Sequence, residues 1–140
     1  MVRLGVNGVL LDTHALIWLV TTPDRLGRRA LRLANGAQAD GALHVSAISF
    51  WEIAMLAQRG SLKLRVPPGR WRSEVLRLGV QEAPVDGAIA IRSTELMTAH
   101  RDPADRIIVA TGLELGATLV TADEALLDWK GKLKRQDARR

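Results

Sequence analysis

Short apolar runs alternate with longer segments of helical periodicity along the chain. The runs predict β-strands, because short apolar stretches bounded by turn signals are typical of buried strands. These predicted strands cover 9–11, 43–45, 80–83 and 118–121. Helices are predicted between them, over 13–20, 27–37, 46–59, 70–78, 86–96, 102–115 and 122–129, with an extended segment at 63–66.

Strands separated by helices indicate βαβ units, in which parallel strands form a sheet that helices cover on both faces. The chain has no internal repeat and no shift in composition, so we interpret 1–140 as one domain of the α/β class. We expect an α/β/α sandwich around a central, mostly parallel sheet. Ligands of such sheets bind beyond the carboxyl ends of the strands, so the residues that follow each strand carry the most functional information.

Composition excludes several classes of protein. The chain has 140 residues, 47% of them hydrophobic, which is ordinary for a globular domain and argues against intrinsic disorder. It has 0 cysteines, which excludes a disulfide scaffold, a thiolate zinc site and a cysteine nucleophile. No apolar run reaches the roughly 18–20 residues of a membrane span, and the N-terminus lacks the pattern of a signal peptide. We therefore expect a cytoplasmic protein that does not bind membranes.

The charge balance raises the ranking of a nucleic-acid partner. The formal net charge is +5, and most of the basic residues are arginines, whose planar guanidinium suits phosphate. Charge alone leaves a simply solvated surface equally open, because net charge does not determine function. The stretch 130–140 is strongly basic. Three interpretations stay open: it binds RNA phosphate, it contacts a protein partner, or it is a loose, solvated tail, which we favour.

Acidic residues follow the predicted strands. Asp12 comes directly after the first strand, and two residues separate Asp123 from the run 118–120, so both are expected at one edge of the sheet. Either one taken alone could be no more than a helix cap. Glu52 allows two interpretations: it completes a capping box with Ser49, or, if the helix begins at Ser46, it lies beyond the first turn and needs another explanation.

A further acid, Asp105, opens the apolar helix 102–115, in which we assign Asp102 mainly to capping. Converging carboxylates repel one another, and a divalent cation removes that repulsion. Oxygen ligands without cysteine favour Mg²⁺ or Mn²⁺ over Zn²⁺. Such a site activates water and stabilises a phosphoryl group in transfer, which suits phosphodiester hydrolysis by a basic protein.

Four segments together resemble the motifs of PIN-domain ribonucleases of the VapC toxin type. They are 10–19 (LLDTHALIWL), 46–54 (SAISFWEIA), 100–106 (HRDPADR) and 119–126 (LVTADEAL), in the order of the family and spread over nearly the whole chain. The resemblance implies a Mg²⁺- or Mn²⁺-dependent endoribonuclease that cleaves RNA. It also implies a VapB-type antitoxin as protein partner, and a homodimer.

The resemblance further implies a catalytic and metal-binding set, which consists of Asp12, Glu52, Asp105 and Asp123. Asp12 and Asp105 are expected to bind the metal directly, and Asp123 through water. Glu52 is expected to orient the attacking water or to hold a second ion. The hydroxyls of two threonines are expected to support these acids from behind, namely Thr13 and Thr121.

The remaining candidate residues are given structural roles. His14 lies in an apolar helix, where a structural role is expected. Trp18 and Trp51 are predicted to pack in the core. Trp71, between two arginines, is predicted at a surface that contacts a dimer partner, an antitoxin or RNA.

Other folds with an acid after the first strand fit less well. A haloacid-dehalogenase-like phosphatase needs a second Asp where His14 stands, a receiver domain needs a late lysine on a strand, and a dinucleotide-binding domain needs a glycine-rich turn. The alternative that stays open is a non-catalytic RNA- or partner-binding PIN module. Metal-dependent RNA cleavage distinguishes it from a nuclease.

Overall fold

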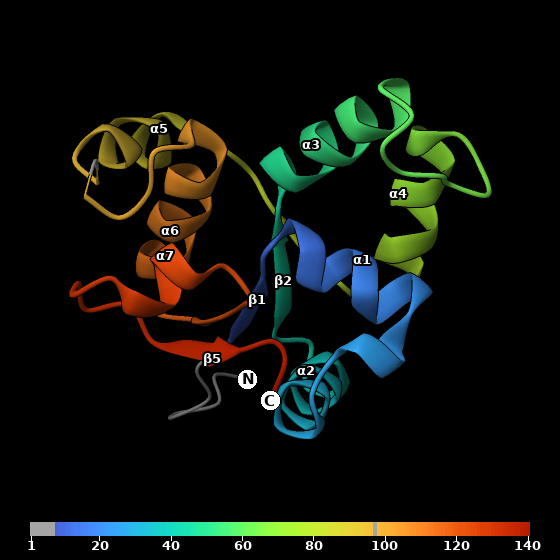
Figure 1. Ribbon diagram of the computed structural model, residues 1–140, viewed down its shortest axis with the longest axis horizontal. Helices are drawn as coiled ribbons and strands as arrows, with labels where there is room; N and C mark the ends of the chain where they lie inside the picture. Colours follow the sequence, from blue (N-terminus) through green and yellow to red (C-terminus); the bar gives the residue numbers. More distant parts are fainter. Residues whose placement is uncertain (1–7, 97) are drawn as a thin grey trace.

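A five-stranded parallel sheet forms the centre of the computed structural model, which describes residues 8–96 and 98–140 (Figure 1). The strand order is β3-β2-β1-β4-β5, and every neighbouring pair is parallel. The strands are β1 (Val9–Leu11), β2 (Leu43–Ser46), β3 (Gln81–Ala83), β4 (Thr118–Thr121) and β5 (Arg135–Asp137). The predicted fold class is confirmed, and the segment around residue 1, on which the absence of a signal peptide was judged, lies outside the described residues.

Helices connect the strands as βαβ units require. They are α1 (Thr13–Thr21), the 3₁₀ turn η1 (Pro23–Arg25), α2 (Arg28–Ala39), α3 (Ala47–Gln58), α4 (Pro68–Arg77), α5 (Gly87–Thr94), α6 (Pro103–Leu115) and α7 (Glu124–Asp128). Each predicted helix is present, although α7 is shorter than the predicted 122–129. The segment 63–66 is not a strand: it bends between α3 and α4 and packs Leu64 and Val66 on the core. Within the described residues, none of the helices is both long and apolar enough to cross a membrane.

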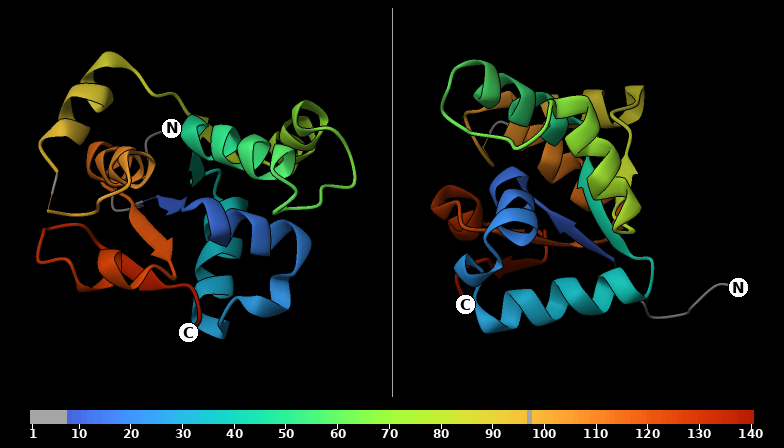
Figure 2. Two further views of the ribbon diagram at one scale, coloured as in Figure 1. Left: turned by 45° about the horizontal axis from the view of Figure 1, so that its top comes forward. Right: turned by 90° about the vertical axis from the view of Figure 1, so that its right-hand side faces the viewer.

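The two faces of the sheet carry separate hydrophobic layers, because side chains alternate along a strand. Val9 and Leu11 of β1 face the layer built with α1, α2, α3 and α4, whereas Leu10 faces the layer built with α6 and α7. Figures 1 and 2 show these two groups of helices on opposite sides of the strands. All three β1 side chains are at most 2% exposed, so β1 is the buried centre of the sandwich.

Helix α6 begins and ends where the sequence predicted. The Asp102 carboxylate accepts a hydrogen bond from the backbone N–H of Ala104 at 2.9 Å, and Pro103 occupies the first helical position, where it loses no hydrogen bond. At the other end Gly116 adopts a φ of 62°, a left-handed conformation that costs glycine little. The capping role assigned to Asp102 is therefore confirmed.

The expectation of a loose basic tail is wrong. Residues 135–137 form β5, which adds to the sheet beside β4. Leu133 is 5% exposed and Ala138 is fully buried, so two apolar side chains anchor the stretch, while its lysines and last two arginines remain exposed. The backbone oxygen of Arg140 accepts a hydrogen bond from Ala30 at the start of α2. The basic side chains gave no sign of a strand, because the strand pairs through backbone hydrogen bonds.

Two tryptophans lie opposite to expectation. Trp51 is 56% exposed, and Trp71 is 4% exposed and packs edge-to-face on Phe50 at 6.3 Å between ring centroids. Helix α3 is apolar on nearly every side, so its sequence does not reveal that Ser49 and Ile53 face inward. In α4 the arginines around Trp71 point outward, while Trp71 and Val75, four residues apart, share the buried face.

Arg135 connects β5 to the segment before it. Its guanidinium donates hydrogen bonds to the backbone oxygens of Leu126, Trp129 and Gly131 at 2.7, 2.5 and 3.2 Å, and it lies over the Trp129 ring. The Leu126 carbonyl lies in the last turn of α7 and the other two follow the helix, so no further helical turn satisfies them. Arg135 thus supplies donors to a helix end and holds the last strand in place.

We predict that Arg135→Ala lowers the free energy of unfolding by about 2 kcal/mol, and the melting temperature by roughly 5–8 °C, because charged hydrogen bonds to partly buried carbonyls are lost. Thermal unfolding followed by circular dichroism measures this. Lys134→Ala, which removes an exposed cation from the same segment, is the control and should change the melting temperature by less than about 2 °C. Equal melting temperatures of the two variants would contradict the role of Arg135.

Candidate functional site

The site lies where the strand order reverses across the sheet. From β1 the chain continues outward through β2 and β3, then returns to place β4 on the other side of β1. In this arrangement Leu11 pairs with Val120, and the backbone N–H of Asp12 donates to the Val120 oxygen at 3.1 Å. Asp12 and Asp123 therefore emerge side by side at the carboxyl edge, which is where ligands bind in open α/β sheets.

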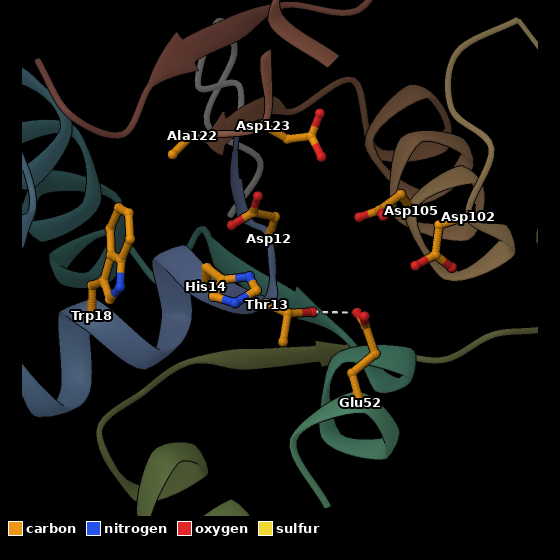
Figure 3. Close-up of a pocket in the computed structure, with 9 residues that line it drawn as sticks. All are labelled: Asp12, Thr13, His14, Trp18, Glu52, Asp102, Asp105, Ala122 and Asp123. Carbon is orange, nitrogen blue, oxygen red and sulfur yellow. Dashed lines mark hydrogen bonds between the residues drawn. The ribbon is translucent and has the colours of Figure 1, made fainter. Parts of the chain in front are cut away.

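A pocket of about 310 Å³ opens at this edge. Figure 3 shows carboxylates pointing into it from α3, α6 and the ends of β1 and β4, while α1 forms the opposite wall. All four acids predicted from the sequence line the pocket, and Asp102 adds a fifth. The lining residues are Asp12, Thr13, His14, Trp18, Glu52, Asp102, Asp105, Ala122 and Asp123.

Asp12 is the most buried of these acids, with 6% of its surface exposed. One carboxylate oxygen accepts a hydrogen bond from the backbone N–H of Ala15 at 2.8 Å, which caps α1, and the other accepts one from the Thr121 hydroxyl at 2.5 Å. Burial raises the pKa of Asp12 above its ordinary value, and these two hydrogen bonds only partly oppose it. Thr121 thus contacts Asp12 directly through its hydroxyl.

Glu52 is not part of a capping box. The cap of α3 is Ser46, whose hydroxyl accepts from the N–H of Ile48, so Glu52 lies beyond the first turn. Its carboxylate accepts a hydrogen bond from the Thr13 hydroxyl at 2.5 Å, and Ser49 lies 2.9 Å from the same hydroxyl. Burial raises the pKa of Glu52, while the Thr13 hydrogen bond acts against the shift. Of the two interpretations, only the non-capping one survives.

Asp105 lies in the first turn of α6 and faces the other acids. Burial raises its pKa to about 7, and the charges of Glu52, Asp102 and Asp123 add to the effect, while His100 opposes it. This carboxyl group therefore changes its protonation near neutral pH.

Asp123 behaves differently because it has strong donors. It caps α7 by accepting from the N–H of Leu126 at 3.2 Å, and its second oxygen lies 2.8 Å from Nε2 of His100. Partial burial acts to raise the pKa of Asp123, but the His100 hydrogen bond and the helix amides outweigh it and keep the pKa below its ordinary value. His100 opens the HRDPADR segment, but no role was predicted for it from the sequence.

His14 and Trp18 form the α1 wall of the pocket. His14 is exposed and faces the acids, so the prediction of a structural role for it is wrong. The buried side of α1 carries Ala15, Leu16 and Ile17, which leaves positions 14 and 18, one turn apart, on the pocket side. Trp18 packs partly on the core, as predicted, and also lines the pocket under the guanidinium of Arg25, 5.5 Å from its ring centroid.

The donor set fits a hard divalent cation. The pocket offers carboxylate oxygens from five residues, and donor atoms of His100, Asp105 and Asp123 lie within 4.8 Å of one another. Oxygen-rich sites without thiolates suit Mg²⁺ or Mn²⁺. The raised pKa values of Asp12, Glu52 and Asp105 show that the carboxylates repel or are poorly solvated, and a bound cation would relieve both effects.

Comparison with known proteins agrees with this geometry. The sequence profile of the PIN domain matches residues 9–132. This chain belongs to the PIN domain family. It is 35% identical over 122 residues to Ribonuclease VapC22 of Mycobacterium tuberculosis, a match that covers 84% of this chain and 88% of that protein. The resemblance of its four motifs to VapC-type PIN proteins is confirmed.

Solved structures share the fold at lower sequence identity. A DNA-bound VapBC from Salmonella typhimurium superposes with a TM-score of 0.67 at 16% identity, covering 94% of this chain and 98% of that one. A toxin-antitoxin complex from Klebsiella pneumoniae gives a TM-score of 0.62 at 24% identity, with the same coverage. Both likenesses support the α/β/α architecture of a PIN domain.

The raised pKa of Asp105 predicts how stability depends on pH. Between its ordinary value of 3.8 and its folded value of about 7, the folded chain holds a proton that the unfolded chain has released. This contribution is complete at low pH and is lost as the pH rises through 7. We predict that the free energy of unfolding of the metal-free wild type falls between pH 5 and 8, and that it falls by about 1–2 kcal/mol less in metal-free Asp105→Asn. The difference is no larger because partial exposure of Asp105 screens the effect.

Chemical denaturation of both proteins in EDTA at pH 5 and 8 measures the difference. Asp24→Asn, which neutralises an exposed acid on η1 outside the pocket, is the control and should follow the wild type. Adding Mn²⁺ at pH 8 should stabilise the wild type more than Asp105→Asn, because only the wild type retains this negative charge for the cation. Identical pH profiles for the wild type and Asp105→Asn would contradict the assignment.

Proposed function

We propose that the protein is a Mg²⁺- or Mn²⁺-dependent endoribonuclease, the toxin of a VapBC-type toxin–antitoxin pair, which hydrolyses RNA phosphodiester bonds. The observation that carries this proposal is the convergence of five carboxylates on one pocket in a chain whose net charge is +5. A basic exterior attracts a polyanion, while an acidic pocket supports metal-dependent phosphodiester chemistry. The name of the relative, Ribonuclease VapC22, supports the same reaction class.

Each pocket residue has a role in this proposal. Asp12, Asp105 and Asp123 would hold the cation, whose chemistry is to activate water and to neutralise charge on the phosphoryl group. Glu52 would orient the attacking water and accept its proton, and its raised pKa makes the carboxylate a stronger base. The Thr13 hydroxyl fixes Glu52, and the Thr121 hydroxyl fixes Asp12.

The same proposal includes a protein partner. Solved structures that share this fold include a toxin-antitoxin complex from Klebsiella pneumoniae and a DNA-bound VapBC from Salmonella typhimurium. We propose a VapB-type antitoxin that blocks the pocket, a homodimeric toxin, and action in the cytoplasm, where RNA substrates are present. Expression without the antitoxin should arrest growth if this proposal holds.

We predict that Asp12→Asn reduces metal-dependent RNA cleavage by at least about 100-fold, because losing a charge at the cation is worth several kcal/mol. The purified protein, free of antitoxin, is incubated with total RNA in Mg²⁺, in Mn²⁺ and in EDTA. Asp24→Asn is the matched control and should cleave like the wild type. Cleavage that persists in EDTA or in Asp12→Asn would overturn the assigned site.

The alternative, a non-catalytic RNA- or partner-binding module, makes the opposite prediction. It binds RNA or antitoxin through the same basic surface but leaves the RNA intact in every metal condition. Expression without a partner then separates the two functions. A nuclease arrests growth and Asp12→Asn relieves the arrest, whereas for a binding module Asp12→Asn changes nothing.

Glu52→Gln tests the role of Glu52 separately. We predict a loss of cleavage of about 10²–10⁴-fold, as for removal of a general base, with the melting temperature unchanged or raised. Stability is retained because Gln keeps an acceptor for the Thr13 hydroxyl and removes a half-buried charge. A lowered melting temperature with full activity would instead make Glu52 structural.

A further inference from the structure

His100 lies between two acids of the pocket. Its Nε2 is 2.8 Å from Oδ2 of Asp123, and its Nδ1 is 3.5 Å from Oδ2 of Asp105. Nδ1 also receives a hydrogen bond from the backbone N–H of Asp102 at 2.9 Å. The side chain is 17% exposed, so it is held among these groups rather than free in solvent.

These contacts determine where the ring proton lies. A backbone N–H only donates, so the Asp102 amide requires a lone pair on Nδ1. A neutral ring whose Nδ1 accepts carries its proton on Nε2, and that proton is donated to Asp123. Both ring nitrogens are then engaged, and the neutral ring has no lone pair left for a cation.

The hydrogen bonds continue in one direction beyond Asp123. The backbone N–H of Asp123 donates to Oγ1 of Thr121 at 3.0 Å, and the Thr121 hydroxyl donates to Oδ2 of Asp12 at 2.5 Å. This series of hydrogen bonds therefore runs from the start of α6 through His100, Asp123 and Thr121 to Asp12. It connects Asp102, Asp123 and Asp12 of the third, fourth and first motifs, which precede α6, α7 and α1.

Given the nuclease reaction of Proposed function, on which this inference rests, we propose that His100 is a positioning residue. It donates through Nε2 to Asp123 and sets the orientation of that carboxylate relative to Asp12 and Asp105. It acts without binding the cation itself. The ring also occupies the space between Asp105 and Asp123, which keeps two like-charged groups apart. Outer hydrogen bonds of this kind commonly change metal affinity or activity by about 10–100-fold when removed.

Two substitutions separate the functions of the two ring nitrogens. In His100→Gln the side-chain amide nitrogen takes the place of Nε2 and can still donate to Asp123, whereas the acceptor for Asp102 is lost. In His100→Asn the amide oxygen can replace Nδ1 as acceptor, but the shorter side chain does not reach Asp123. His100→Ala removes both. His44→Gln, on β2 outside the pocket, is the matched control.

We predict that Mn²⁺ affinity, measured by calorimetry, falls about 10–100-fold in the Asn and Ala variants and less than about 3-fold in the Gln variant and in His44→Gln. The kcat for RNA cleavage should follow the same order. If His100→Gln loses as much Mn²⁺ affinity and kcat as His100→Ala, the ring itself contacts the ion or the RNA, and the proposal is overturned. If Asn and Ala resemble the wild type, His100 has no positioning role.

A measurement on the wild type keeps the test independent of variant folding and of RNA cleavage. In metal-free protein labelled with ¹⁵N-histidine at pH 8, the proton of His100 should lie on Nε2, with the signal assigned by its absence in His100→Gln. A proton on Nδ1 would sink the proposal. If the wild type cleaves no RNA but the tautomer and the order of Mn²⁺ affinities hold, the proposed nuclease function fails while the positioning role of His100 stands.

Discussion

The parallel pairing of β1 with β4 is the constraint on which the site depends. Because Leu11 lies opposite Val120, the residues that follow these strands, Asp12 and Asp123, are brought to one edge of the sheet. Burial of β1 on both faces holds this register, since slipping by one residue would turn each apolar side chain to the wrong layer. The packing of the core therefore holds the carboxylates close together although they repel one another.

That opposition divides the acids into two kinds. Burial, with the charges of neighbouring carboxylates added to it, raises the pKa of Asp105 to about 7, whereas Asp123 receives enough hydrogen bonds for its pKa to stay below the ordinary value. Environments that push neighbouring pKa values apart are typical of sites that handle protons and cations together. The pocket thus has one acid that stays ionised beside one whose charge responds to pH, and a cation would favour the ionised form of both.

Features set by local sequence were predictable, and features set by distant packing were not. Short runs in the sequence predicted β1, β2, β3 and β4, and the Asp-Pro pair and Gly116 predicted both ends of α6. Helix α3 is apolar all round, so nothing local showed that Trp51 points outward. The basic sequence of β5 did not predict a strand, because β5 is held beside β4 by backbone hydrogen bonds. His100 was missed because its partner Asp123 lies 23 residues further along the chain.

Capping and function do not compete as explanations for these acids, because one carboxylate has an oxygen for each. In Asp12 one carboxylate oxygen accepts a hydrogen bond from the N–H of Ala15 and the other accepts one from the Thr121 hydroxyl. In Asp123 one oxygen accepts from the N–H of Leu126 and the other contacts Nε2 of His100. The cap fixes the side-chain torsion, and the helix N-terminus adds partial positive charge beside the acid. Three helix starts, those of α1, α6 and α7, are capped by pocket acids, and their partial charges offset part of the repulsion that the sheet imposes. Local helix chemistry therefore makes it possible to hold the carboxylates together before any cation binds.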